Sequence, residues 1–187
     1  AAVAVDVYVT APGDNLDDFG PNFGGVGSGQ TTIGLRLSPG TYRVRGAISG
    51  SKIVIYDSGT VELVENTSIN LLFYTLQSAS LLQCMVLPVG GSGSGAVVAT
   101  NQVSALKVVN AAIDAGTIDG FVDGTKFVDD IPYAVATAYL FQATGAHTLT
   151  FEATSTAGAA IASLQRTLES TSDISVLVVG FPGAVQA

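Results

Sequence analysis

The stretch that decides the fold is a turn followed by an alternating run, Ser38-Pro39-Gly40-Thr41-Tyr42-Arg43-Val44-Arg45-Gly46-Ala47-Ile48. Pro followed by Gly is typical of a tight turn, because Pro fixes its own φ and Gly tolerates positive φ. After the turn, polar and apolar residues alternate with a period of two. This period puts the apolar side chains on one face of an extended strand and the polar ones on the other. The stretch therefore predicts a strand with one buried face.

The same alternation occurs elsewhere in the chain. Residues 3–9 alternate Val with Ala, Asp and Tyr, and residues 32–37 alternate Ile33, Leu35 and Leu37 with Thr, Gly and Arg. Turn residues separate such runs, and no long window keeps a helical period; residues 159–168 fit either a short helix or a strand. Short strands with regularly spaced turns are typical of a β-sandwich. We expect an all-β protein.

The chain also repeats itself. Residues 5–9 align with residues 118–122, which lie 113 positions later, and residues 39–44 and 63–72 align with segments 105 positions later. The change in spacing indicates about eight extra residues in the first copy, in the loop that contains residues 11–18. A Gly/Ser run at 90–96 is typical of a flexible linker. We expect two tandem immunoglobulin-like or transthyretin-like β-sandwich domains, residues 1–89 and 97–187.

Particular segments resemble a known family. They read Leu-Lys-Val-Val-Asn-Ala-Ala at 106–112, Ile-Asp-Gly-Phe-Val-Asp-Gly at 118–124, Asp-Val-Tyr-Val at 6–9 and Pro-Gly-Thr-Tyr-Arg-Val at 39–44. They resemble the bacterial and archaeal domain of unknown function 4397, in two copies. The resemblance implies secreted or cell-surface sandwich modules, often in tandem, without a shared catalytic residue. The second copy departs from the family pattern where Gly120 replaces Val and His147 replaces Tyr.

Composition excludes several classes of protein. Of the 187 residues, 48% are hydrophobic and 12% charged, so the chain is too apolar to be disordered. No apolar run reaches the ~18 residues that span a bilayer, and we expect no membrane insertion. The net charge is −8 and no basic stripe is present, so nucleic acid would be repelled. Cys84 is the only cysteine, which excludes an intrachain disulfide, and its apolar surroundings predict a buried, inert thiol.

Residues that could carry chemistry are few. His147 is the only histidine and takes the place of Tyr42 in the repeat, so we interpret it as a packing residue and predict neither enzymatic activity nor a cofactor. Calcium binds oxygen ligands, which makes Asp14, Asp17 and Asp18 of the inserted loop candidates for a weak calcium site. Asp129 and Asp130 are their counterparts in the second copy. The spacing fits no known calcium loop, and a solvated acidic loop is the other interpretation.

Two functions fit these features. The first is a non-catalytic structural or adhesive protein, extracellular or in the cell envelope, that forms a homo-oligomer or homopolymer. The alternative is a module that binds a surface glycan or another small ligand through exposed tyrosines. Its candidates are Tyr8, Tyr56, Tyr133 and Tyr139, unless these rings are buried. The sequence opens at Ala1-Ala2, which fits a mature chain after removal of a signal peptide; a trimmed chain is the other interpretation.

The ends of the two copies suggest how chains would associate. The second copy opens with a strand at 105–110 that the first copy lacks, and the first closes with a strand at 80–87 that the second lacks. A sandwich without one of its strands exposes a pairing edge. We expect head-to-tail strand addition into a filament, with residues 1–10 of one chain on the sheet that ends in residues 174–181 of another. Other segments filling the gaps within each domain is the alternative.

Overall fold

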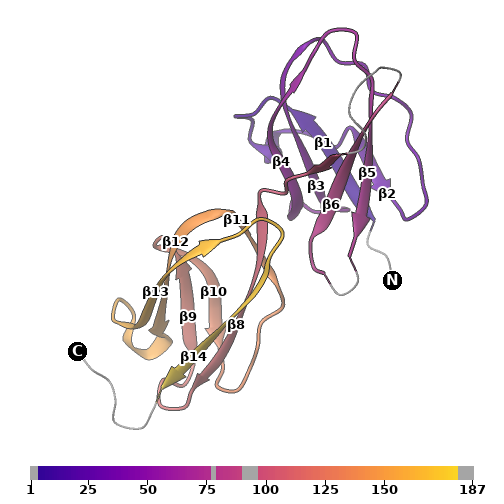
Figure 1. Ribbon diagram of the computed structural model, residues 1–187. Helices are drawn as coiled ribbons and strands as arrows, with labels where there is room; N and C mark the ends of the chain where they lie inside the picture. The colour runs from indigo at the N-terminus through magenta and orange to yellow at the C-terminus, as the bar shows by residue number, and fades with distance from the viewer. Residues whose placement is uncertain (1–3, 77–78, 90–96, 181–187) are drawn as a thin grey trace. The chain divides into compact units, whose positions relative to one another are not determined.

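The computed structural model describes residues 4–76, 79–89 and 97–180 (Figure 1). Two compact units are present, Ala1–Val103 and Ser104–Ala187. Strands make up both units, together with the single 3-10 turns η1 (Leu16–Asp18) and η2 (Thr154–Thr156). This confirms the all-β prediction. Nowhere in the described ranges is there a helix that is long and apolar enough to cross a membrane.

The first unit has two antiparallel sheets. The larger has the strand order β2-β1-β3-β4, and the smaller β5-β6-β7. The ring of Tyr56 in β4 packs edge-on against Phe73 in β5, with centroids 5.3 Å apart, so the two sheets face each other. The bounds are β1 Val5–Thr10, β2 Phe23–Val26, β3 Gly40–Ile48, β4 Val54–Leu63, β5 Ile69–Thr75, β6 Leu82–Pro88 and β7 Val97–Ala99.

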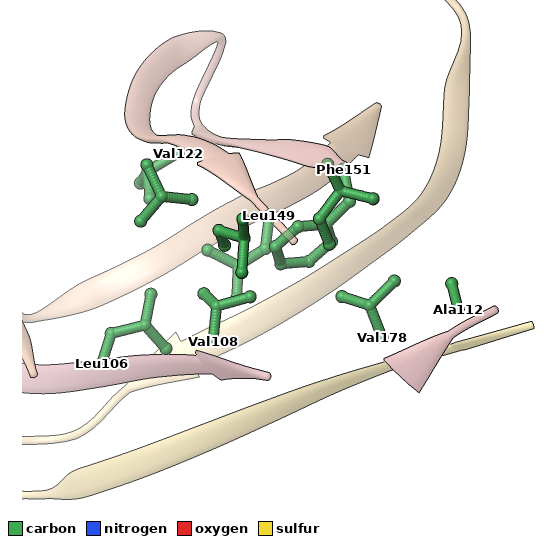
Figure 2. Packing of buried hydrophobic residues seen from close by; sticks show 10 residues of the cluster. Leu106, Val108, Ala112, Val122, Leu149, Phe151 and Val178 are labelled. Atoms are coloured by element: carbon green, nitrogen blue, oxygen red, sulfur yellow. The ribbon is translucent and has the colours of Figure 1, made fainter. Parts of the chain in front are cut away.

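The second unit also has two sheets, ordered β10-β9-β12-β13 and β11-β8-β14. In Figure 2, Val122, Leu149 and Phe151 of the larger sheet face Leu106, Val108 and Val178 of the smaller one, and together they form the core. Two facing sheets with a shared apolar core are what a β-sandwich requires. The bounds are β8 Val103–Ala112, β9 Ile118–Val122, β10 Thr125–Ile131, β11 Leu140–Ala143, β12 Gly145–Ala153, β13 Ala160–Leu168 and β14 Asp173–Gly180. Residues 159–168, ambiguous in sequence, thus form a strand.

The central strand of the smaller sheet comes from near the end of the first unit but from the start of the second. This strand is β6 in the first unit, antiparallel to β5, and β8 in the second, parallel to β14. The gaps expected from the sequence are therefore filled within each unit. The expectation that residues 1–10 pair with another chain is wrong for β1, because this strand is hydrogen-bonded to β2 on one side and β3 on the other.

Two further expectations differ from the structure. Residues 32–37 form no strand, and every residue from 31 to 38 is exposed, with Ile33 at 85%. The predicted linker at 90–96 lies outside the described residues. The short strand β7 that follows it pairs with β6, and the division between units falls after Val103. The pairing of β7 with β6 places residues 97–99 in the first unit, a contact that a local reading of sequence cannot assign.

The inserted loop of the first unit is anchored by one apolar residue. Leu16 is buried against Tyr8 and Ala47, which point away from the smaller sheet. Lys52 donates to the carbonyl oxygens of Leu16 and Phe19, and its ammonium lies 4.5 Å from the centre of the Tyr8 ring. The insertion therefore covers the outer face of the larger sheet.

Candidate functional site

The aspartates at equivalent positions of the two units, Asp6 and Asp119, are buried carboxylates. In Asp6, Oδ1 accepts from the Gly25 amide at 2.7 Å and the Ser49 hydroxyl at 2.9 Å, and Oδ2 accepts from the Gly50 amide at 2.9 Å. These donors stabilise the charged form, the Gly25 amide most of all, and they hold the pKa of Asp6 below its usual value. The donors come from segments beside β1, so this carboxylate links those segments to the strand by hydrogen bonds. Its oxygens are occupied by these bonds and do not face a substrate.

Asp119 does the same in the second unit and also carries an ion pair. Its Oδ1 accepts from the Asp130 amide at 2.9 Å, and its Oδ2 accepts from Lys126 Nζ at 2.9 Å. Lys126 also donates to Asp129 at 2.7 Å, so the ammonium lies between two carboxylates, which raise its pKa. Oxygens of Asp119, Asp129 and Asp130 lie within 4.8 Å of one another. Lys126 already pairs with two of the three carboxylates, and in the described part of the chain no second feature indicates a metal.

The calcium candidates of the first unit lie in the inserted loop. Asp14 accepts from the Ala11 amide at 2.9 Å through its own carboxylate, while Asp17 and Asp18 are exposed. Within the described ranges, these three residues belong to no group of carboxylates close enough to share an ion. Their positions favour the solvated acidic loop over a calcium site.

His147 has both ring nitrogens engaged. Nδ1 lies 2.7 Å from Asp123 Oδ2, and Nε2 lies 3.0 Å from the carbonyl oxygen of Ala143, four residues earlier. In the first unit, Tyr42 makes the equivalent contact, donating its hydroxyl to the carbonyl of Ser38 at 2.8 Å. A general base needs a nitrogen that faces its substrate. The geometry favours the packing interpretation, in which His147 anchors the turn before β12.

The four candidate tyrosines are not brought together in one unit. Tyr8 and Tyr56 are buried in the first unit, at 2% and 1% exposure. In the second unit Tyr133 is 46% exposed, and the partly buried Tyr139 lies beneath the Lys107 ammonium, 4.3 Å from the ring centre. The second unit also has two depressions, of about 400 and 280 Å³. Neither lining contains a Tyr, Phe or Trp: the residues are Ala115, Gly116, Thr117, Asp130, Thr154 and Ser155 in one, and Ala146, His147, Thr148, Gln165, Arg166 and Thr167 in the other.

Two buried asparagines were not singled out by the sequence reasoning. Asn101 donates from Nδ2 to the carbonyls of Ile55 in β4 and Leu82 in β6, at 3.0 and 2.9 Å, and thereby bridges the two sheets of the first unit. Asn110, in the middle of β8, donates to the carbonyls of Gly116 and Ile131 at 2.8 and 2.9 Å. The sequence signal that could have identified Asn110 is a polar amide side chain between Val109 and Ala111 in an otherwise apolar strand.

The open edge of β14 is the strongest candidate for an interaction surface. In the described part of the second unit, β14 is hydrogen-bonded to β8 on one side and is the last strand of its sheet on the other. Leu177 and Val179 point outward from it, 58% and 60% exposed. The strand contains neither Pro nor a bulge, the usual devices that protect a sheet edge from pairing with another chain.

One of the comparisons with known proteins finds a match, and it covers part of the chain. Residues 104–187 match the family model described as a domain of unknown function, DUF4397. These bounds coincide with those of the second compact unit. No curated protein matches the chain.

Proposed function

We propose that this protein is a non-catalytic structural or adhesive component of the extracellular space or cell envelope, and that its chains associate head to tail through strand addition into a filament. The observation that carries the proposal is the open, apolar edge of β14. An unprotected edge presents unpaired amide and carbonyl groups, which a strand from another chain can satisfy.

We further propose that the first unit is a diverged copy of the second, of immunoglobulin-like or transthyretin-like type. The larger sheets have equivalent strand orders, β2-β1-β3-β4 and β10-β9-β12-β13. The buried carboxylates of Asp6 and Asp119 bond to equivalent neighbouring segments, and Tyr42 and His147 contact equivalent carbonyls. Tandem copies suit a structural role, because repeating one folded unit extends the length that each chain contributes.

The bonding of the buried titratable side chains supports a non-catalytic role. Asp6, Asp119 and His147 are each engaged in bonds that fix the fold. The extracellular or cell-envelope location rests on the family resemblance, which implies secreted and surface modules.

Sedimentation velocity over a range of protein concentrations, with negative-stain microscopy of the same samples, tests the proposal. We expect species that grow with concentration and appear as linear polymers. A single monomeric species at all concentrations would overturn it.

The alternative, a module that binds a glycan or small ligand, is favoured only by the exposure of Tyr133. A glycan array probed with the labelled protein distinguishes the two functions. Binding that is lost on Tyr133→Ala, in a protein that stays monomeric, would favour the alternative.

A further inference from the structure

We infer that residues 31–37 are the donor strand, and that they pair with the open edge of β14 in a second copy of this chain. The inference rests on the proposed head-to-tail association and names the two segments that would meet.

The donor segment has the sequence of a strand but no place in a sheet. Apolar Ile33, Leu35 and Leu37 alternate with Thr32, Gly34 and Arg36, the pattern of a half-buried strand. In the structure, residues 31–38 adopt no regular structure, and all are exposed. Ile33 is 85% exposed, and Leu35 and Leu37 are 41% and 39% exposed. Three apolar side chains on one face of a short segment would be shielded from water by pairing with another sheet.

The corresponding segment of the second unit does form a strand. Residues 35–38 align with Leu140–Ala143, 105 positions later, and these residues are β11, at the edge of the smaller sheet beside β8. Just before β11, the Thr137 amide donates to the carbonyl of Val108 at 2.9 Å. In the first unit, β7 takes the corresponding edge beside β6. Residues 31–37 therefore keep the sequence of an edge strand while another strand occupies their position.

Along its open edge, β14 has backbone amides and carbonyls directed toward the position of an added strand. Ala105 donates its amide to the carbonyl of Ser172 at 2.9 Å, and β14 runs parallel to β8 in continuous register. Backbone groups alternate in direction along a strand, so the amides and carbonyls of Ser175, Leu177 and Val179 are directed to the open edge. The apolar side chains of Leu177 and Val179 are at the same positions, and an added strand would lie beside them.

The charges of the two segments are complementary. Residues 27–39 contain Arg36 and no acidic residue. Residues 104–187, by contrast, contain eight acidic and three basic residues, a net charge of −5. A weakly basic donor segment would thus pair with an acidic second unit, although the net charge of the whole chain is −8. Complementary charge of this kind favours the encounter of the two surfaces.

The two segments belong to different units, so one chain carries one donor and one acceptor. A contact between unlike surfaces is heterologous, and it propagates as an open polymer unless its geometry closes a ring. This gives an experiment with a distinctive outcome.

Three samples test the inference by sedimentation velocity: Leu35→Lys, Leu177→Lys and their equimolar mixture. A lysine at either position places a charge in the contact, so we expect each variant alone to remain monomeric. In the mixture, the intact donor of Leu177→Lys meets the intact acceptor of Leu35→Lys, and we expect dimers but no longer species. Ile33→Lys and Val179→Lys repeat the test at second positions, and circular dichroism checks that each variant is folded.

Matched controls place the same charge on exposed apolar residues elsewhere in each unit. Ile53→Lys in the first unit and Leu164→Lys in β13 replace residues that are 50% and 45% exposed, and both variants should polymerise as the wild type does. If the wild type itself stays monomeric, the proposed function fails. If it polymerises and Leu35→Lys and Ile33→Lys polymerise equally well, only the donor assignment fails. If Leu177→Lys and Val179→Lys alone polymerise as the wild type does, β14 is not the acceptor. If every variant is monomeric but the mixture forms no dimer, the two segments do not pair with each other.

Discussion

Asp6 is a single residue on which several segments of the first unit depend. Its carboxylate accepts hydrogen bonds from Gly25, Ser49 and Gly50. Asp6→Asn replaces one acceptor oxygen by a donor group that faces another donor. We expect the free energy of unfolding to fall by about 1.5–3 kcal/mol, the range for hydrogen bonds to charged groups. Chemical denaturation measures the change, with Asp18→Asn in the exposed loop as the control; equal stability of the two variants would contradict the assigned role.

The same residue predicts a dependence of stability on pH. The pKa of Asp6 is lowered in the folded state, mainly by the Gly25 amide, so the folded protein binds this proton less readily than the unfolded chain. The stabilisation is therefore fully present above the unfolded pKa of about 3.9 and is lost as pH falls through the lower folded value. We expect the difference in stability between wild type and Asp6→Asn to shrink below pH of about 4. A difference that stays constant down to pH of about 2 would argue against this source of stability.

Cys84 gives a prediction of reactivity at the same scale. The side chain is 1% exposed, and burial raises its pKa to about 11. Because the thiolate is the reactive form, a buried and protonated thiol should react with a thiol reagent only when the protein unfolds. We expect slow labelling in native buffer and rapid labelling in denaturant. Leu164→Cys serves as the comparison, since its added thiol, at a position that is 45% exposed and outside the proposed contact, should label at once in the folded protein while Cys84 stays slow.

At the scale of strands, Gly120 shows how packing between neighbours limits the sequence of β9. A Cβ at this position would lie 2.5 Å from Val128 Cγ2 and 2.9 Å from Phe127 Cε1. These contacts leave no room for a side chain at position 120. Gly120→Ala overpacks the core and should destabilise the second unit by about 1–3 kcal/mol. Thermal unfolding measures it against Gly34→Ala, whose Cβ would meet nothing within 4 Å. A melting temperature equal to that of the control would show that β10 shifts to accommodate the methyl group.

Residues 31–37 show, at the same scale, that strand sequence and strand structure are separable. Alternation gives a segment the ability to cover one face of a sheet, but a strand forms only where a neighbour supplies hydrogen bonds. In the first unit β7 takes the edge beside β6 that β11 takes beside β8 in the second. The segment is left exposed for that reason, and not because its own sequence disfavours a strand.

At the scale of the whole molecule, the distribution of charge predicts an effect of Arg36. Arg36→Glu changes the net charge from −8 to −10 and places an acid opposite an acidic unit. We expect the apparent association to weaken severalfold at low ionic strength and the difference to narrow as salt screens the charges. Arg166→Glu in β13 gives the same net charge of −10 without altering the donor and is the matched control. Equal weakening in both variants would mean that net repulsion, rather than the donor segment, is responsible.

The sequence by itself determined the all-β class, the alternation of each main strand and the burial of Cys84, because these depend on local periodicity and apolar neighbours. It also indicated that the loop containing residues 11–18 is longer than its counterpart in the second unit. Tertiary structure decided which strand fills the centre of each smaller sheet, that Tyr8 and Tyr56 are buried, and that Lys126 lies among Asp119 and Asp129. Those outcomes depend on contacts between residues distant in sequence. β6, near the end of the first unit, and β8, at the start of the second, fill equivalent central positions in the smaller sheets. Periodicity within one segment carries no information about which strand fills such a position.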